Sequence, residues 1–185
     1  MELVPEHDGL LLQRVHEGDL SALGVLYDRH YRAVLRLARY LLPEESEAED
    51  VAQEVFLTAA RVASSFDGRP SSRSWLFGIA ARLVLNRTRR GARFLRFVQR
   101  LAAQSGDAQV PEPEETLLQG ELRLQLTEAL HKLTPHKRVV IVLAEVEGLS
   151  GPEIAATLGI PIGTVWTRLH HARNALRDQL RRTHA

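Results

Sequence analysis

The sequence predicts an all-α protein built of two small helical domains joined by a flexible linker, with a helix-turn-helix in the C-terminal domain. Long segments repeat apolar residues at three-to-four spacing, which is typical of helices buried on one side. Residues 101–114 break this pattern with two prolines, several acids and few large apolar groups, as linkers do. Near the C-terminus, EIAATLGIPIGTVWTRLHHARNAL places two helical patterns on either side of a short turn.

The first domain, residues 7–100, is expected to contain three main helices after a weaker one at residues 8–16. Residues 19–42 keep one apolar face, and Pro43 interrupts the pattern. The next helix has an acid-rich first turn, which suits the helix dipole, and runs to Val62 before an FDGRP turn. Ser71 or Ser72 can cap the third helix, which we expect at residues 74–100.

The second domain, residues 115–182, is expected to begin with a helix over residues 115–132. Thr134 and Pro135 then read as an N-cap and a first-turn proline, although the run VVIVL at residues 139–143 could be a buried strand. The cap and the stop at Gly148 favour the helix. Ser150 to Glu153 form a capping box, and Gly159 supplies the left-handed residue of a tight turn.

The last helix starts at Pro161 and has two different faces. Projection at about 100° per residue gives an apolar stripe. The stripe consists of Ile162, Val165, Leu169, Ala172 and Leu176. The opposite face holds Gly163, Thr167, His170, His171 and Asn174, with Trp166, Arg168 and Arg173 on its flanks. These groups could contact base edges and phosphates, and the alternative is an ordinary amphipathic helix with a wet outer face. The coincidence of cap, turn and small-residue spacing favours a helix that reads DNA.

The charges of the chain are segregated, although the net charge is only +1. Residues 44–54 hold six acids and no base, residues 71–100 hold eight arginines and no acid, and residues 104–121 hold five acids and no base. Arginine outnumbers lysine 22 to 2, which suits bidentate contacts with phosphate or guanine. Each block could be a solvated helix face, but three alternating blocks favour separate surfaces for separate partners.

Several classes of protein are disfavoured by the sequence. The absence of cysteine excludes disulfides, thiolate metal ligands and a thiol nucleophile, and it fits a cytoplasmic location. A signal peptide and a bilayer-spanning segment are not expected either. There is no Gly-rich phosphate loop, nucleophile motif or metal-ligand cluster, so we expect no enzyme, no cofactor and no metal site. His170 and His171 are adjacent on a helix and therefore diverge, which argues against a shared metal.

Two blocks in order carry a family resemblance. AEDVAQEVFLTAAR followed by SWLFGIAARLVLNRTRR, and LTPHKRVVIVLAEVEGLSGPEIAATLGIPIGTVWTRLHHARNALRDQL after them, resemble the extracytoplasmic-function (ECF) sigma factors of bacterial RNA polymerase. The match covers residues 19–180 apart from the linker. It implies an alternative sigma factor that binds core RNA polymerase, recognises promoter DNA and promotes its melting, with an anti-sigma factor as inhibitor. The alternative is a regulator that binds an operator directly through the same helix-turn-helix.

The resemblance also implies residue roles. The acidic helix would dock on the polymerase clamp through Asp50, Gln53, Glu54 and Phe56. The loop at residues 67–74 and the helix after it would hold the minus-ten element. The minus-ten contacts would be Trp75, Arg82, Asn86, Arg89 and Arg90. The minus-thirty-five contacts would be Trp166, Thr167, Arg168, His170, His171 and Arg173.

Two features of the first domain qualify these roles. Trp75 is equally compatible with a role as a core aromatic that anchors its helix. Many relatives read WLxxIAxN with a basic residue before the Ile, whereas this chain has Gly78 and Arg82 at the departing positions. The resemblance therefore does not imply which minus-ten bases are captured.

Overall fold

The computed structural model describes residues 7–68, 71–102 and 120–183, and this part of the chain contains helices and no strand. The elements are α1 (Asp8–His16), α2 (Leu20–Leu41), α3 (Glu45–Val62), the 3-10 turn η1 (Ala63–Ser65), α4 (Ser72–Ala102), α5 (Gly120–His131), α6 (Pro135–Glu145), α7 (Gly151–Leu158) and α8 (Ile162–Thr183). The all-α prediction is confirmed. The strand considered at residues 139–143 is wrong, because these residues belong to α6.

The predicted linker lies between the end of α4 and the start of α5. Residues 103–119 hold most of the linker predicted at 101–114 and the start of the helix predicted at residue 115, and they lie outside the described residues. None of the helices in the described ranges is long and apolar enough to cross a membrane.

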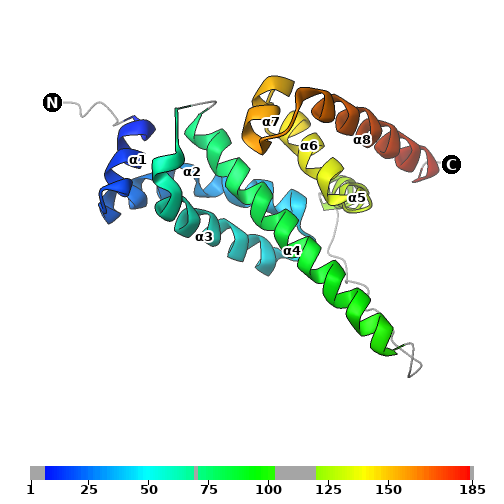
Figure 1. Cartoon of the computed structure of the whole chain (residues 1–185). Helices are drawn as coiled ribbons and strands as arrows, with labels where there is room; N and C mark the ends of the chain where they lie inside the picture. Colours follow the sequence, from blue (N-terminus) through cyan, green and yellow to red (C-terminus); the bar gives the residue numbers. More distant parts are fainter. Residues whose placement is uncertain (1–6, 69–70, 103–119, 184–185) are drawn as a thin grey trace.

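In the N-terminal half, α2, α3 and α4 pack side by side and α1 lies across one end of α2 (Figure 1). Asp19 caps α2 by accepting a hydrogen bond from the backbone N–H of Ser21 at 2.8 Å, and α2 ends just before Pro43. Ser71 caps α4, because its hydroxyl accepts from the backbone N–H of Ser74 at 3.1 Å. Tyr27, Tyr31 and Phe56 form an aromatic cluster between α2 and α3.

In the C-terminal half, α7 and α8 form the predicted helix-turn-helix. The capping box is present: the backbone N–H of Ser150 donates to Oε2 of Glu153 at 2.7 Å, and the Ser150 hydroxyl accepts from the Glu153 backbone. Gly159 ends α7 with φ of 64°. Along the predicted stripe of α8, Val165, Leu169 and Ala172 are buried and Leu176 is half-buried. Ile162 is 44% exposed, so the buried stripe begins one turn later than predicted.

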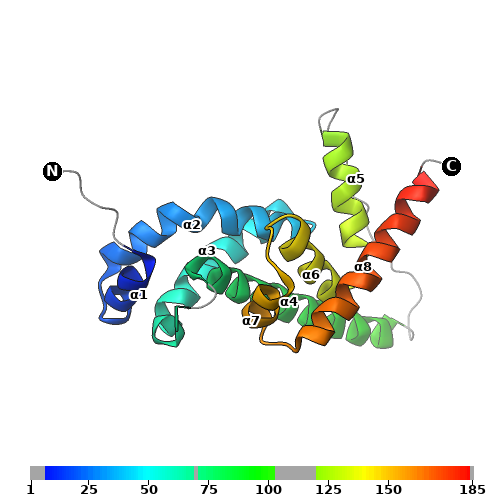
Figure 2. The ribbon, with the colours of Figure 1, turned by 90° about the horizontal axis from the view of Figure 1, so that it is seen from above.

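The two halves pack against each other, and one hydrophobic core runs through both. α7 lies on α4, and α6 lies against α2, as Figures 1 and 2 show from two directions. The shared core extends from Val34 and Leu37 in α2 to Ile154 in α7 and Leu169 in α8. Every predicted site residue is therefore held on a helix whose inner face belongs to this core.

Candidate nucleic-acid interface

The acidic and amide residues predicted to contact the polymerase lie on one exposed face of α3. Asp50 and Gln53 are exposed, and Glu54 is half-buried because its Oε2 accepts from Arg87 of α4 at 2.9 Å. Spacings of three and four residues place these groups on the same side of α3. Leu57 continues that side at the next turn and is 65% exposed. Sequence reasoning missed Leu57, although the same spacing could have revealed it.

Phe56 faces the other way. Its side chain is 3% exposed, and its ring centroid lies 4.9 Å from that of Tyr27. The structure thus places Phe56 in the core beneath the acidic face. In this position its contribution is to hold α3 against α2, while Asp50 and Gln53 are the groups available to a partner.

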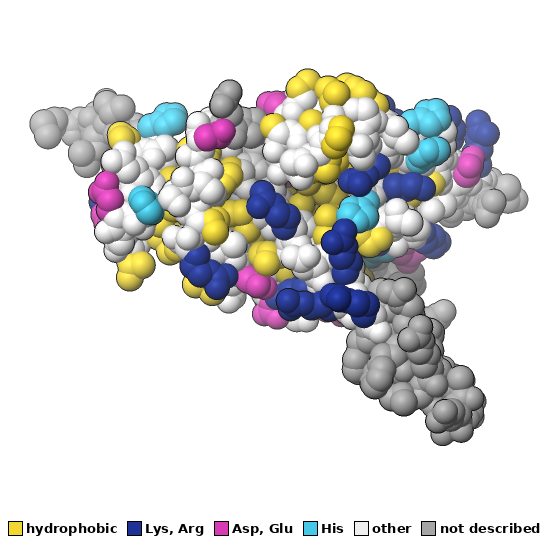
Figure 3. All heavy atoms as spheres, viewed as in Figure 1, with side chains coloured by type: hydrophobic (Ala, Val, Ile, Leu, Met, Phe, Trp, Pro, Cys, Tyr) yellow, Lys and Arg dark blue, Asp and Glu magenta, His cyan; other side chains and the backbone are white. Residues whose placement is uncertain are grey.

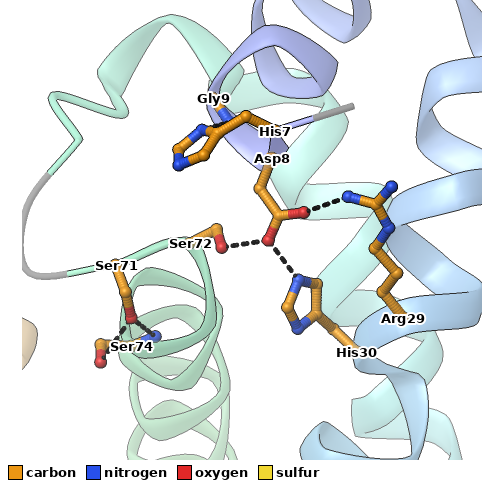
Figure 4. Close-up of polar contacts among 8 residues, drawn as sticks. All are labelled: His7, Asp8, Gly9, Arg29, His30, Ser71, Ser72 and Ser74. Atoms are coloured by element: carbon orange, nitrogen blue, oxygen red, sulfur yellow. Dashed lines mark hydrogen bonds and ion pairs between the residues drawn. The ribbon is translucent and has the colours of Figure 1, made fainter. Parts of the chain in front are cut away.

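The start of α4, where the minus-ten loop was predicted, is fixed from α1 (Figure 4). The Asp8 carboxylate accepts from Arg29 at 2.7 Å, lies 2.6 Å from Nε2 of His30, and accepts from the hydroxyl of Ser72. Burial acts to raise the pKa of Asp8, but the hydrogen bonds from Ser72, Arg29 and His30 outweigh it, so the pKa is lowered. Sequence reasoning had no signal for this contact, which joins residues 64 positions apart.

Trp75 is half-buried in the first turn of α4. Its ring packs edge-to-face on Phe66, with ring centroids 5.6 Å apart. One side of the indole packs inside the protein, as expected of a core aromatic, and the rest is open to solvent.

The other residues predicted to contact the minus-ten element lie along one groove. Arg82, Asn86, Arg89 and Arg90 are exposed on α4. A groove of about 670 Å³ lies between α4 and the start of α6. A second pocket of about 300 Å³ shares Asn86, Arg89 and His136 with it and is also lined by Arg168 of α8. The described lining residues include no carboxylate. They comprise Arg82, Asn86, Arg89, Arg90, Arg93, His136, Arg168 and apolar residues such as Leu85, Val139 and Ile160.

The groove is strongly cationic. Figure 3 shows Lys and Arg side chains and a histidine gathered around its opening. The pKa of His136 is lowered, first by burial and then by the positive charges of Arg168 and Arg89. A neutral imidazole among guanidinium groups leaves the arginines as the anion-binding groups of this groove.

The residues predicted to contact the minus-thirty-five element all lie on α8. Thr167, His170, His171 and Arg173 are exposed, and the Nη2 of Arg173 forms an ion pair with Glu145 at 2.7 Å. Thr167 donates to the carbonyl of Gly163 at 2.9 Å, which leaves its oxygen free to accept a second hydrogen bond. The outer face of α8 therefore presents a row of donors and acceptors.

Two of the residues predicted to contact the minus-thirty-five element also have contacts inside the protein. Trp166 is 50% exposed, and its other side lies against Gly151, where an added Cβ would come within 2.3 Å of the ring. Arg168 is half-buried and lines the groove with the α4 arginines. The structure thus brings one predicted minus-thirty-five residue next to the predicted minus-ten surface.

Comparison with known families matches both halves. The Sigma-70 region 2 model matches residues 26–94, and the Sigma-70 region 4 model matches residues 123–176. The chain is 33% identical over 177 residues to the ECF RNA polymerase sigma factor SigW of Bacillus subtilis, covering 92% of this chain and 95% of that protein. It is 32% identical over 180 residues to the ECF sigma-E factor of Escherichia coli K12, covering 94% of each.

Solved structures agree with this likeness. CnrH in complex with the cytosolic domain of CnrY has a TM-score of 0.66 at 29% identity, covering 95% of this chain and 97% of that one. The sigma factor RpoE of Bartonella quintana, in complex with the anti-sigma factor NepR, has a TM-score of 0.62 at 26% identity, covering 82% and 91%.

Proposed function

The chain belongs to the extracytoplasmic-function sigma factors of bacterial RNA polymerase, and we propose a division of work among its three exposed surfaces. As an alternative sigma factor it directs core RNA polymerase to specific promoters. Its partners are the polymerase, promoter DNA and an anti-sigma factor, of the kind bound to the solved relative RpoE. The observation that supports the division is that an acidic face, an arginine-lined groove and a polar helix face lie on three different helices, α3, α4 and α8.

The α3 face is our candidate for polymerase docking. Asp50, Gln53 and Glu54 offer carboxylate and amide oxygens to basic groups of the polymerase. Leu57, on the same side and 65% exposed, adds apolar surface that the same contact would bury. Phe56 supports this face from the core.

The α4 and α8 surfaces are our candidates for promoter DNA. Arg82, Asn86, Arg89 and Arg90 would follow the phosphates of the melted minus-ten strand, and the exposed part of Trp75 would stack on a base. The bases of the minus-thirty-five duplex would be read by Trp166, Thr167, His170 and His171. Arg168 and Arg173 would contact the phosphates of the DNA beside them.

This division assigns residues 7–100 to polymerase and minus-ten binding, residues 101–114 to the linker and residues 115–182 to minus-thirty-five binding. The chain itself would perform no covalent chemistry and would need no cofactor, because phosphoryl transfer belongs to the polymerase. Its place of action would be the cytoplasm, where the polymerase and the promoters are.

The decisive experiment is transcription of a genomic fragment library by bacterial core polymerase, with and without this protein, followed by mapping of the transcript starts. We expect new starts that share two upstream elements. Thr167→Ala and His171→Ala should change the upstream element, whereas Asp50→Ala and Gln53→Ala should lower all starts together by weakening binding to the polymerase by about ten-fold.

Two exposed residues on other surfaces provide matched controls. Asp28→Ala on α2 removes a carboxylate outside the α3 face, and Arg181→Ala removes a cation at the far end of α8. Both should leave the pattern of starts unchanged. A folded protein that yields no new starts with core polymerase would contradict the proposed division and favour direct binding to an operator.

A further inference from the structure

The first helix, α1, precedes the residues that match Sigma-70 region 2, which begin at residue 26. It nevertheless contacts residues on both sides of the connection between η1 and α4. On one side, Gly9 of α1 lies beside Phe66, because a Cβ added at Gly9 would be 4.0 Å from the Phe66 ring. On the other side, the Asp8 carboxylate accepts a hydrogen bond from the hydroxyl of Ser72, the first residue of α4 (Figure 4).

The Asp8 carboxylate is held by α2 while it bonds α4. Its Oδ1 accepts from Arg29 at 2.7 Å, and its Oδ2 lies 2.6 Å from Nε2 of His30. Only 19% of the Asp8 side chain and 9% of Ser72 are exposed. A largely buried carboxylate with three hydrogen-bond partners has little freedom to move. Asp8 therefore fixes the position of Ser72 relative to α2.

Ser72 belongs to the helical turn that carries Trp75. The backbone N–H of Trp75 donates to the carbonyl oxygen of Ser71 at 2.9 Å, and the Ser71 hydroxyl caps the same turn. The Trp75 ring packs on Phe66 and against the hydrophobic cluster that includes the buried face of α1. Both the backbone of this turn and the buried side of its indole are thus positioned from α1.

A second carboxylate, Glu147, reaches the same turn from the C-terminal half. Glu147 lies between α6 and α7, has no exposed side-chain surface, and accepts from Arg36 of α2 at 2.8 Å and from Arg73 at 2.6 Å. This contact joins the two halves, but it reaches the turn through the long, flexible side chain of Arg73. The Ser72 hydroxyl is attached directly to Cβ, so a shift of Asp8 passes directly to the turn.

We propose that Asp8 is a positioning residue for promoter melting. Through Ser72 it holds the first turn of α4 so that the exposed part of Trp75 meets an unpaired base of the minus-ten strand. Stacking requires the indole and the base to lie face to face, so a small rotation of the turn weakens it. Asp8 itself does not touch the DNA. The proposal rests on the assignment of the minus-ten surface to α4.

The test uses holoenzyme assembled from bacterial core polymerase and the full chain. It is bound to a DNA fork that has a duplex upstream part and an unpaired minus-ten strand, taken from a promoter mapped in the library experiment. The affinity for the intact strand is compared with that for strands in which one unpaired base at a time is replaced by an abasic site. The ratio of the two affinities measures base capture, because the upstream contacts and the contacts with polymerase are the same in both forks.

Three variants are compared with the parent protein. Ser72→Ala removes only the hydroxyl that donates to Asp8 and leaves the contacts of Asp8 with α2 in place. Asp8→Asn removes the charge and keeps the size of the side chain. Glu17→Gln is the matched control, because it makes the same change from acid to amide at an exposed residue at the other end of α1.

We expect the parent to bind the intact strand about ten-fold more tightly than the strand without the captured base, the magnitude of stacking on an aromatic side chain. In Ser72→Ala and Asp8→Asn this ratio should fall to about three-fold or less, with the affinities for the abasic fork and for core polymerase unchanged. Glu17→Gln should keep the ratio of the parent. The double variant should have the same ratio as Ser72→Ala alone, because Asp8 acts through Ser72.

The inference is overturned if folded Ser72→Ala keeps the ratio of the parent, or if the parent loses no affinity at any abasic position. An equal loss of affinity for the intact fork, the abasic fork and core polymerase also contradicts it, because the contact then supports only the fold. A double variant with a lower ratio than Ser72→Ala would show that Asp8 acts by another route. Failure of the proposed function is seen separately, as the absence of new transcript starts when the unsubstituted protein is added to core polymerase.

Discussion

A single buried cation, Arg138, joins the C-terminal half to α2. Arg138 is 8% exposed, and its guanidinium donates to the carbonyl oxygens of Leu130, His131 and Leu133. It also donates to the carbonyl oxygen of Leu41, at the end of α2, at 2.7 Å. Burial lowers the pKa of Arg138, yet an arginine stays charged at any pH the fold survives. One side chain thus donates to carbonyl groups at the C-terminal ends of both α2 and α5.

His131, beside Arg138, makes stability depend on pH. Burial, and then the charge of Arg138, lower the pKa of His131 to about 4 from 6.5. The folded state therefore favours the neutral imidazole, while the unfolded chain takes up a proton between these values. We expect the free energy of unfolding to fall by about 1–3 kcal/mol as the pH drops from 6.5 to 4.

Urea unfolding measured across this range checks the prediction. His131→Asn should flatten the pH dependence, whereas His171→Asn, at an exposed histidine on α8, should leave it unchanged. A slope that survives in His131→Asn would assign the pH dependence to other groups, first to His136, whose pKa is also lowered from 6.5. Asp8 does not contribute in this range, because the stability that goes with its lowered pKa is lost only as the pH falls below 3.8.

At the level of the helices, glycine has opposite effects at the end and in the middle of an element. Gly159 ends α7 with φ of 64°, a conformation that alanine adopts only at a cost. Gly24 lies inside α2 with open space around it. Gly159→Ala should lower the free energy of unfolding by about 1 kcal/mol, and Gly24→Ala should raise it by about 0.5–1 kcal/mol.

Thermal unfolding of the two variants beside the parent protein measures this difference. Both variants replace a glycine by an alanine, so the effect of the change in composition cancels when the two variants are compared. Equal shifts for the two variants would mean that the turn between α7 and α8 tolerates alanine, and that the helix-turn-helix does not depend on the left-handed residue.

For the molecule as a whole, the shared core predicts that the two halves unfold together. The chain has two tryptophans, Trp75 in the first half and Trp166 in the second, and each can serve as the only fluorescent reporter when the other is replaced by Phe. In each single-tryptophan variant the fluorescence midpoint should coincide with that of the helical circular dichroism signal. Adding Glu147→Gln should separate the two, because it weakens the contact between the halves.

The comparison of fluorescence with circular dichroism is made inside one variant, so the stability lost by a Phe substitution does not affect it. A fluorescence midpoint that departs from the helical signal without Glu147→Gln would show that the halves unfold independently despite their common core.

Most of the helices could be predicted from the sequence, because their signals are local. The Ser71 and Ser150 caps, the stop before Pro43 and the Gly159 turn each depend on residues within one or two helical turns. The apolar stripe of α8 was predicted nearly in full, and only Ile162, at the open end of the helix, is more exposed than its pattern indicated. The strand-like run at residues 139–143 shows the limit, since an unbroken apolar run has no period.

The sequence by itself therefore determined the all-α class, the helix-turn-helix and the acidic, basic and polar helix faces, because side-chain spacing along one helix decides which groups share a face. Only the tertiary structure decided that Phe56 lies beneath the α3 face, that Arg168 meets the α4 arginines, and that Glu147 joins the two halves. These contacts link residues from different helices, 74 positions apart for Arg73 and Glu147. Such pairings depend on how the helices pack, which no local pattern of residues records.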